Sequence, residues 1–164
     1  MLEAAAAVGR VCIEVAISRA WVDEAGRLRP AFYTAAFDGS IDRLKDVFGL
    51  DAAWRERHRR STVALEARLT VLGPAWQDET LQIESRIVDF DAKRLHIAQV
   101  LARGEEWVAT RESMAISFDL DARRSCGFAP DIATQIAALH AAHSQLPDWH
   151  WVGQQRVALA ELNN

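Results

Sequence analysis

Asp23 is the first residue of the chain whose type and position could serve chemistry. Residues 21–33 read WVDEAGRLRPAFY, so the aspartate lies in a glycine-containing turn seven residues before Pro30. Proline fits the first turn of a helix, where its missing N–H matters least, and we therefore expect a helix to begin there. Asp23 is then either a residue that shapes the turn or a carboxylate held beside a helix N-terminus for acid–base or nucleophilic chemistry.

Other reactive side chains form weaker patterns. His140, His143 and His150 lack the spacing and the supporting Asp, Glu or Cys residues of a zinc site, so we predict no metal. His96 lies between Leu95 and Ile97 in a strand-like segment. It is therefore expected to be a structural histidine of the sheet and not a catalytic base. The chain also lacks the G-x-S-x-G elbow of serine hydrolases and a glycine-rich phosphate loop.

Two helices are expected to position these groups. The first runs from Pro30 to a stop at Gly49, and its apolar residues recur at steps of three and four: Tyr33, Phe37, Ile41, Leu44 and Phe48. Gly39 costs this helix roughly 1 kcal/mol relative to Ala, and we expect close packing on another surface to explain it. A second helix should begin near Pro130.

The remaining segments have the alternating pattern of strands. Strands are expected at residues 10–18, 61–72, 80–90, 94–102 and 107–121, and short turns join the last four. In the second strand, Val63, Leu65, Ala67, Leu69 and Val71 should share one face, with Glu66, Arg68 and Thr70 on the other. Glu112 would point into an apolar face, where a salt bridge, for example with an Arg of a neighbouring strand, is the expected role.

This order of elements predicts an α+β protein with the hot-dog fold. An antiparallel meander of about five strands must curve around one long helix to cover its apolar stripe, and a C-terminal helix follows. We expect one domain over residues 1–164, with a core at about 10–120 and the helix and tail at 129–164. The tail segment PDWHWVGQQ is too aromatic for exposed disorder and should pack, for example across a partner subunit.

Composition narrows the function classes. Half of the 164 residues are apolar, the net charge is −4, and no apolar run reaches 18 residues, so we expect neither nucleic acid nor membrane as partner. The start of the chain does not resemble a secretory signal, and Cys12 and Cys126 are expected to be free thiols of a cytoplasmic protein. The basic run RERHRR at residues 55–60 is either a solvated surface segment or a positive patch that attracts the phosphate groups of a ligand.

Five segments in this order resemble the thioesterase-like hot-dog family of the 4-hydroxybenzoyl-CoA thioesterase type, in the branch that includes betainyl-CoA thioesterases. They are WVDEAG, AFYTAAFD, LEARLTVL, DAKRLHI and ATRESM, and the resemblance covers about residues 15–143. It implies hydrolysis of an acyl-CoA thioester by a homodimer or a dimer of dimers, with the pocket at the subunit boundary. No cofactor is implied beyond the coenzyme A of the substrate.

The resemblance also assigns roles. In the family the turn commonly reads W-[IV]-D-Y-N-G-H-[ML]-N, and its aspartate, here Asp23, is the nucleophile or general base. Backbone N–H groups at the helix start then stabilise the oxyanion, which points to Arg29, Pro30 and Ala31. Candidate contacts with substrate or coenzyme A are Gly26, Arg27, Arg29, Tyr33, Asp38, Glu66 and Arg68.

This chain departs from the family pattern around the turn. Glu24, Ala25, Arg27 and Arg29 replace the Tyr, the two Asn and the His of the motif, and Arg68 replaces a His common in the branch. Pro30 lies where relatives use a backbone N–H, which proline lacks. Arg27 and Arg29 either bind an anion, hold Asp23 ionised, or are solvated.

Several alternatives therefore remain open at the sequence level. Asp38 either belongs to a polar helix flank with Asp42 and Asp46 or serves as an acid on the helix, as in another hot-dog lineage. A betaine-like acyl group would favour an aromatic cage, for which Trp21, Trp76 and Trp107 are candidates. Besides a thioesterase, the chain could be a non-catalytic acyl-CoA-binding or regulatory protein, or a dehydratase-like enzyme with a His and a carboxylate meeting across a dimer.

Overall fold

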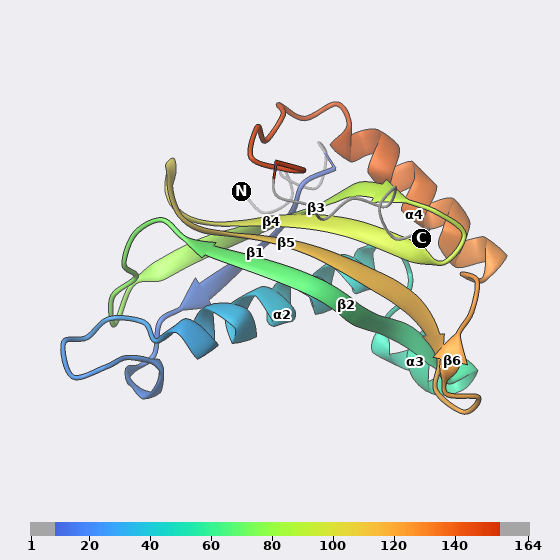
Figure 1. The fold of residues 1–164 in the computed structure, drawn as a ribbon, viewed down its shortest axis with the longest axis horizontal. Helices are drawn as coiled ribbons and strands as arrows, with labels where there is room; N and C mark the ends of the chain where they lie inside the picture. Colours follow the sequence, from blue (N-terminus) through green and yellow to red (C-terminus); the bar gives the residue numbers. More distant parts are fainter. Residues whose placement is uncertain (1–8, 155–164) are drawn as a thin grey trace.

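The computed structural model describes residues 9–154, which form one curved sheet with helices on either side (Figure 1). The elements, in chain order, are β1 (Val11–Ala16), the 3-10 helix η1 (Arg19–Trp21), α2 (Pro30–Val47), α3 (Ala52–His58), β2 (Arg60–Val71), β3 (Thr80–Phe90), β4 (Arg94–Arg103), β5 (Glu106–Asp119), β6 (Arg124–Ser125) and α4 (Pro130–His143). The hot-dog fold and the bounds expected for its long elements are confirmed.

The sheet is antiparallel throughout, in the order β1-β3-β4-β5-β2, and the short β6 pairs with β5. β2 is thus an edge strand, although only the short helix α3 separates it from α2 in sequence. The sheet curves over α2, whose buried side chains include Tyr33, Phe37 and Leu44. These residues form the core together with facing side chains of β1, β3, β4 and β5 and with Ile132 and Ile136 of α4.

Polar side chains also fix α2 on the sheet. The hydroxyl oxygens of Ser40 and Ser85 are 2.5 Å apart in the buried interface. The side-chain amide of Gln99 donates to Ser85 Oγ and to the main-chain carbonyl of Phe37, both at 3.0 Å. Because buried polar groups need partners, these bonds define one position of the helix along the sheet.

α4 covers the part of β3 that β1 does not reach. β1 pairs only with residues 80–85, so the end of β3 would otherwise expose its backbone. His143 Nδ1 accepts the Ile87 N–H at 2.9 Å, and His140 Nε2 lies 3.0 Å from the Val88 carbonyl oxygen. Two helix histidines therefore bond to the strand edge in place of a neighbouring strand.

Two expectations about local structure were wrong, and one helix was not expected. The run at residues 55–60 is divided: Arg55 and His58 lie in α3, a helix that the sequence reading missed, and Arg60 begins β2. A bulge at Leu65 shifts the register, so Val63 lies opposite Ile116 on the outer face and does not share a face with Leu69. A Cβ at Gly39 would meet no atom within 4 Å, so close packing does not explain this glycine.

The described part of the tail packs on the outer face of its own sheet. Arg86 donates to the Pro147 carbonyl oxygen at 2.7 Å, and its guanidinium carbon lies 3.8 Å from the centre of the Trp149 ring. Trp149 also stacks on Trp151 and meets Trp107 edge to face. The expected packing of the tail is found within the chain. Residues 155–164 lie outside the described residues.

Within residues 9–154, no helix combines the length and the apolar character that crossing a membrane requires. Cys12 and Cys126 are free, as expected.

Candidate active site

Asp23 is the central residue of the turn between η1 and α2. Its Oδ1 accepts the backbone N–H groups of Ala25 at 2.9 Å and Arg27 at 3.0 Å. Its Oδ2 accepts Arg27 Nε at 3.1 Å and lies 3.1 Å from Arg27 NH2. Gly26 adopts φ +80°, which completes a tight turn that few other residues could form. The carboxylate therefore both shapes the turn and forms an ion pair within it.

This environment favours the ionised carboxylate. The bond from the Arg27 backbone N–H lowers the pKa of Asp23 below its ordinary value of 3.8, and the Ala25 N–H and the Arg27 charge act in the same direction. The side chain is 29 % exposed, so solvent can reach it. Asp23 is thus a permanently charged, accessible carboxylate near neutral pH, which suits a nucleophile better than a strong base.

The start of α2 offers few free backbone donors. Pro30 is its first residue and has no N–H. The Arg29 N–H donates to the Trp21 carbonyl oxygen at 3.0 Å, and the Phe32 N–H donates to Arg29 O at 3.0 Å. Of the three residues expected at the oxyanion position, Ala31 is the one whose N–H has no partner among the described residues.

The loop at residues 73–79 is joined to this turn by backbone hydrogen bonds. The Leu28 N–H donates to Ala75 O at 2.8 Å, and Arg27 pairs with Trp76 through a backbone bridge. Tyr33 holds the same loop from α2, because its hydroxyl accepts the Ala75 N–H at 3.1 Å. Tyr33 is 3 % exposed and hence a structural residue in this chain, not an open substrate contact.

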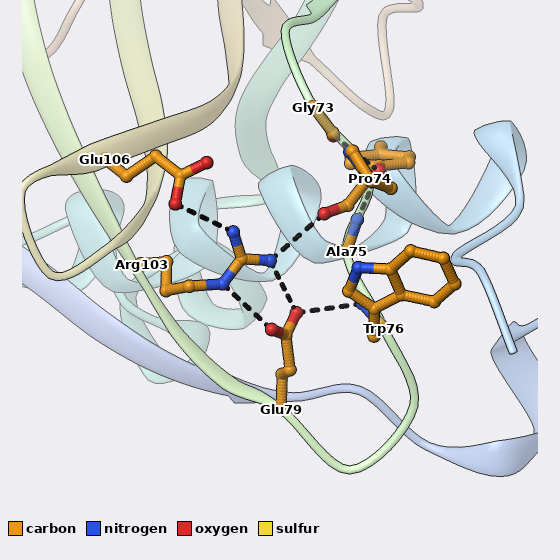
Figure 2. Close-up of polar contacts among 8 residues, drawn as sticks. Gly73, Pro74, Ala75, Trp76, Glu79, Arg103 and Glu106 are labelled. Carbon is orange, nitrogen blue, oxygen red and sulfur yellow. Dashed lines mark hydrogen bonds and ion pairs between the residues drawn. The ribbon is translucent and has the colours of Figure 1, made fainter.

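Arg103 fixes the loop to the sheet, as Figure 2 shows. Its guanidinium donates to both carboxylate oxygens of Glu79 at 2.8 Å, to Glu106 at 3.0 Å and to the Pro74 carbonyl oxygen at 3.0 Å. Glu79 also accepts the Trp76 N–H at 2.8 Å, and the Arg103 bonds are the main reason that its pKa is lowered. Two-point ion pairs of this kind restrict geometry strongly, so the Asp23 turn rests on a rigid support.

A surface hollow of about 540 Å³ opens beside the turn. Its lining includes Arg19, Asp23, Gly26 and Arg29. Arg29 Nε donates to the Val22 carbonyl oxygen at 2.9 Å, which holds the guanidinium against the turn. Two carboxylates, Asp23 and Glu24, and two arginines therefore border an open space next to the start of α2.

The other predicted site residues lie elsewhere. Asp38 is on α2 and its Oδ1 accepts Arg111 NH1 at 2.6 Å. Glu66 and Arg68 lie on the outer face of β2, opposite Met114 and Glu112. A single chain therefore does not bring Asp38, Glu66 or Arg68 to the hollow beside Asp23. Arg111 was missed by the sequence reading, although its place in β5 opposite Leu69, on the helix side, could have drawn attention to it.

Glu112 is paired with a histidine of the neighbouring strand β4. Its Oε1 lies 2.6 Å from His96 Nε2 and accepts the Gly153 N–H at 3.0 Å, and its exposure is 2 %. The expected salt bridge is present, with His96 of β4 as a partner on the same face, and Arg68 of the neighbouring strand β2 lies directly opposite Glu112. This His–carboxylate pair forms within one chain, on the far side of the sheet from α2.

The tryptophans considered for an aromatic cage are in separate contacts. Trp21 stacks on Phe32 with ring centres 5.6 Å apart, whereas Trp107 belongs to the cluster with Trp149 and Trp151 on the outer face. Among the described residues, no group of three or more His, Cys, Asp or Glu side chains could hold a metal ion.

Comparison with known proteins identifies the family. Residues 17–136 match the thioesterase-like superfamily. The betainyl-CoA thioesterase of Pseudomonas aeruginosa is 33 % identical over 136 residues, which are 82 % of this chain and 86 % of that protein.

Solved structures agree with this match. A putative thioesterase from Pseudomonas putida superposes with a TM-score of 0.76 at 27 % identity, covering 89 % of this chain and 94 % of that one. A Staphylococcus aureus protein solved in complex with CoA has the same fold, with a TM-score of 0.83 at 22 % identity over 91 % of this chain and 95 % of that one. The resemblance noted in the sequence is thus confirmed, and the chain belongs to the thioesterase-like superfamily.

Proposed function

We propose that this protein hydrolyses acyl-CoA thioesters, with Asp23 as the catalytic carboxylate. The observation that carries the proposal is the position of Asp23, an ionised and accessible carboxylate at the last turn before α2, in a chain of this family. The Pseudomonas aeruginosa relative is a betainyl-CoA thioesterase, and the Staphylococcus aureus protein was solved with CoA. Both support coenzyme A as the carrier of the acyl group.

The chemistry requires attack at the thioester carbon. As a nucleophile, the Asp23 carboxylate bonds to that carbon, the C–S bond breaks, and CoA leaves as a thiolate. Water then hydrolyses the mixed anhydride, and the acid is released. As a base, Asp23 takes a proton from a water whose oxygen attacks the same carbon, the C–S bond breaks, and Asp23 returns the proton to the sulfur, so that CoA leaves as the thiol. Either route builds negative charge on the carbonyl oxygen, for which the Ala31 N–H at the positive end of α2 is the donor we assign.

The proposed working unit is a cytoplasmic homodimer joined along β2. This strand is an edge of the sheet, and Val63, Leu65 and Val71 on it are 42 %, 54 % and 48 % exposed. Unpaired edges with exposed apolar side chains favour pairing with a second strand. Pairing of two β2 strands would continue the sheet across two chains and bring Glu66 and Arg68 to the subunit boundary.

A non-catalytic acyl-CoA-binding protein is the second candidate, and the start of α2 supports it. All the polar atoms of the Asp23 carboxylate are engaged within its own turn, Pro30 lacks an N–H, and the Arg29 N–H bonds to Trp21. Each feature weakens a step that relatives could use for turnover. The two candidate functions therefore share acyl-CoA as the ligand, and they differ in whether the thioester is hydrolysed.

Thiol release measured beside equilibrium binding separates the two candidates. The full-length protein is given a panel of short, long, aromatic, anionic and cationic acyl-CoA esters, and free thiol is followed with time. We expect release for at least one class, at a rate well above that of the uncatalysed ester. Binding of the same esters without release would establish the binding protein and contradict the proposal.

A further inference from the structure

A second cavity lies between α2 and the sheet, under the edge strand β2. Its volume is about 220 Å³ and its polar lining comes from three elements: Asp38, Asp42 and Lys45 of α2, Thr62 of β2, and Arg111 and Ser113 of β5. One water occupies about 30 Å³ of liquid, so the cavity is large enough for a short chain of a few carbon and oxygen atoms. It is separate from the hollow beside Asp23 in the same chain, with which it shares no residue.

Arg111 has a hydrogen-bond donor that no described residue satisfies. The residue is 6 % exposed, and its NH1 donates to Asp38 at 2.6 Å. Its Nε is buried and has no partner among the described residues. An unmet buried donor destabilises the folded state, and more so when the group is charged. An acceptor oxygen in the cavity would remove this cost.

The charges of the cavity favour an anion. Arg111 and Lys45 are the deep groups, with side chains 7 % and 12 % exposed, whereas Asp38 and Asp42 are each 61 % exposed at the rim. The rim carboxylates are already paired, Asp38 with Arg111 and Asp42 with Lys45 at 3.5 Å. Burial also lowers the pKa of Lys45, so a nearby anion would stabilise its charged form.

We propose that this cavity binds the carboxylate of a short dicarboxylic acid through Arg111 and Lys45. Since the cavity shares no residue with the hollow beside Asp23 of its own chain, selection of CoA esters whose acyl group carries such a carboxylate rests on the proposed dimer, in which the Asp23 turn would come from the partner chain. The far carboxylate would accept from Arg111 Nε, with the hydroxyls of Thr62 and Ser113 as further donors in the same lining. A cationic acyl group such as betaine would meet two buried like charges there. The selected acyl class thus differs from that named for the Pseudomonas aeruginosa relative.

The link to hydrolysis rests on the proposed function, whereas carboxylate binding does not. Free glutarate, butyramide and choline are therefore titrated into the full-length protein by calorimetry or by NMR shift mapping. Glutarate and butyramide share a short aliphatic chain, but only glutarate carries a carboxylate, and choline carries the trimethylammonium group of betaine without its carboxylate. We expect glutarate to bind at least tenfold more tightly than butyramide, with shifts centred on residues 38–45 and 111–113, and no binding of choline.

Four variants locate the site. Arg111→Met should reduce the preference for glutarate to less than twofold, and Arg111→Lys should retain part of it because the charge remains. Arg86→Met is the matched control, because Arg86 is a buried arginine with a carboxylate partner outside this cavity. It should keep the full preference. If Arg111→Met does not fold, Lys45→Met gives the same comparison and should lose at least threefold of the preference.

Two results would overturn the inference: equal binding of glutarate and butyramide by the wild type, or an unchanged preference in Arg111→Met and Lys45→Met. Turnover is scored separately, as the ratio of kcat/KM for glutaryl-CoA to that for butyryl-CoA. Glutarate binding without any thiol release would contradict the proposed hydrolysis and leave the carboxylate site standing. Thiol release with no preference for dicarboxylic esters would support the proposed hydrolysis and contradict selection of the acyl group by this cavity.

Discussion

The guanidinium of Arg27 lies 3.1 Å from the carboxylate of Asp23, and the two residues close one turn between η1 and α2. The same arginine donates its backbone N–H to the other carboxylate oxygen at 3.0 Å. Arg27 stands where the family motif has a histidine, so this chain exchanges a group that can titrate near neutral pH for a fixed charge. The turn keeps its shape and Asp23 keeps its charge over the whole neutral range.

Adding a backbone donor at the start of α2 should raise turnover. Pro30→Ala supplies an N–H in the first turn of the helix, and removing one oxyanion donor from an enzyme costs about 10²–10³ in kcat. We expect kcat for the best acyl-CoA ester to rise about tenfold with little change in KM. Pro130→Ala, at the same position of α4, is the control and should leave kcat unchanged. An unaltered or lower kcat in Pro30→Ala would show that no oxyanion forms there.

Gly39 should be replaceable at a gain in stability. It lies in α2, and a Cβ there meets nothing within 4 Å. Ala is favoured over Gly inside a helix by about 0.5–1 kcal/mol, so Gly39→Ala should raise the free energy of unfolding by that amount in urea titrations. Gly49→Ala should instead destabilise, because Gly49 has φ +87°. A loss of stability in Gly39→Ala would mean that a second chain packs against this turn of the helix.

Falling pH should destabilise the protein through His143. Burial lowers the pKa of His143 from 6.5 to about 4, and the charge of Arg86 acts in the same direction. The unfolded chain therefore takes up a proton between pH 6.5 and 4 that the folded chain does not, and stability present above pH 6.5 is lost as the pH falls through that window. The full effect is about 3 kcal/mol.

His143→Asn is the test, because an asparagine oxygen can still accept the Ile87 N–H. The difference in unfolding free energy between pH 7 and pH 4.5 should be smaller in this variant than in the wild type. Replacing the exposed His58 by Gln should leave the difference as it is. A pH dependence that is the same in all three proteins would rule out His143 as its source.

The edge of β2 should control the oligomeric state. Leu65 is 54 % exposed at the bulge of that strand, and a charged side chain there opposes pairing of two edges. We expect light scattering after gel filtration to give twice the 18.3 kDa of one chain for the wild type and 18.3 kDa for Leu65→Lys. Leu120→Lys places the same charge on another exposed leucine, outside β2, and should stay dimeric. A wild type that runs as a monomer would contradict the proposed assembly.

The fold was predictable because the period of the apolar residues changes with each element. The stripe of Tyr33, Phe37 and Leu44 specifies a helix with one buried face, and all three are buried. α3 was missed because its helix depends on Asp51, whose side chain accepts the Trp54 N–H at 2.8 Å, and not on an apolar stripe. The bulge at Leu65 also left no signal, since a single inserted residue changes the facing of a strand without changing its composition.

The site was predictable only in part. The sequence placed Asp23 in a turn before a helix, and the bonds to Ala25 and Arg27 define that turn. The pairs His96–Glu112 and Asp38–Arg111 depend on strand register and on how α2 lies against the sheet, and neither follows from spacing along the chain. The salt bridge of Glu112 was expected, but His96 as its partner was not.

The kcat/KM of Asp23→Asn on the best acyl-CoA ester is the most direct test of the account. Asparagine keeps an oxygen that can accept the Ala25 and Arg27 N–H groups, so the turn should persist while the charge is lost. Glu24→Gln removes the neighbouring carboxylate as a matched control. We predict a fall of about 10²–10⁴ for Asp23→Asn, with binding of the ester retained and Glu24→Gln close to wild type. Turnover by Asp23→Asn at the wild-type rate would contradict the assignment of Asp23 as the catalytic carboxylate.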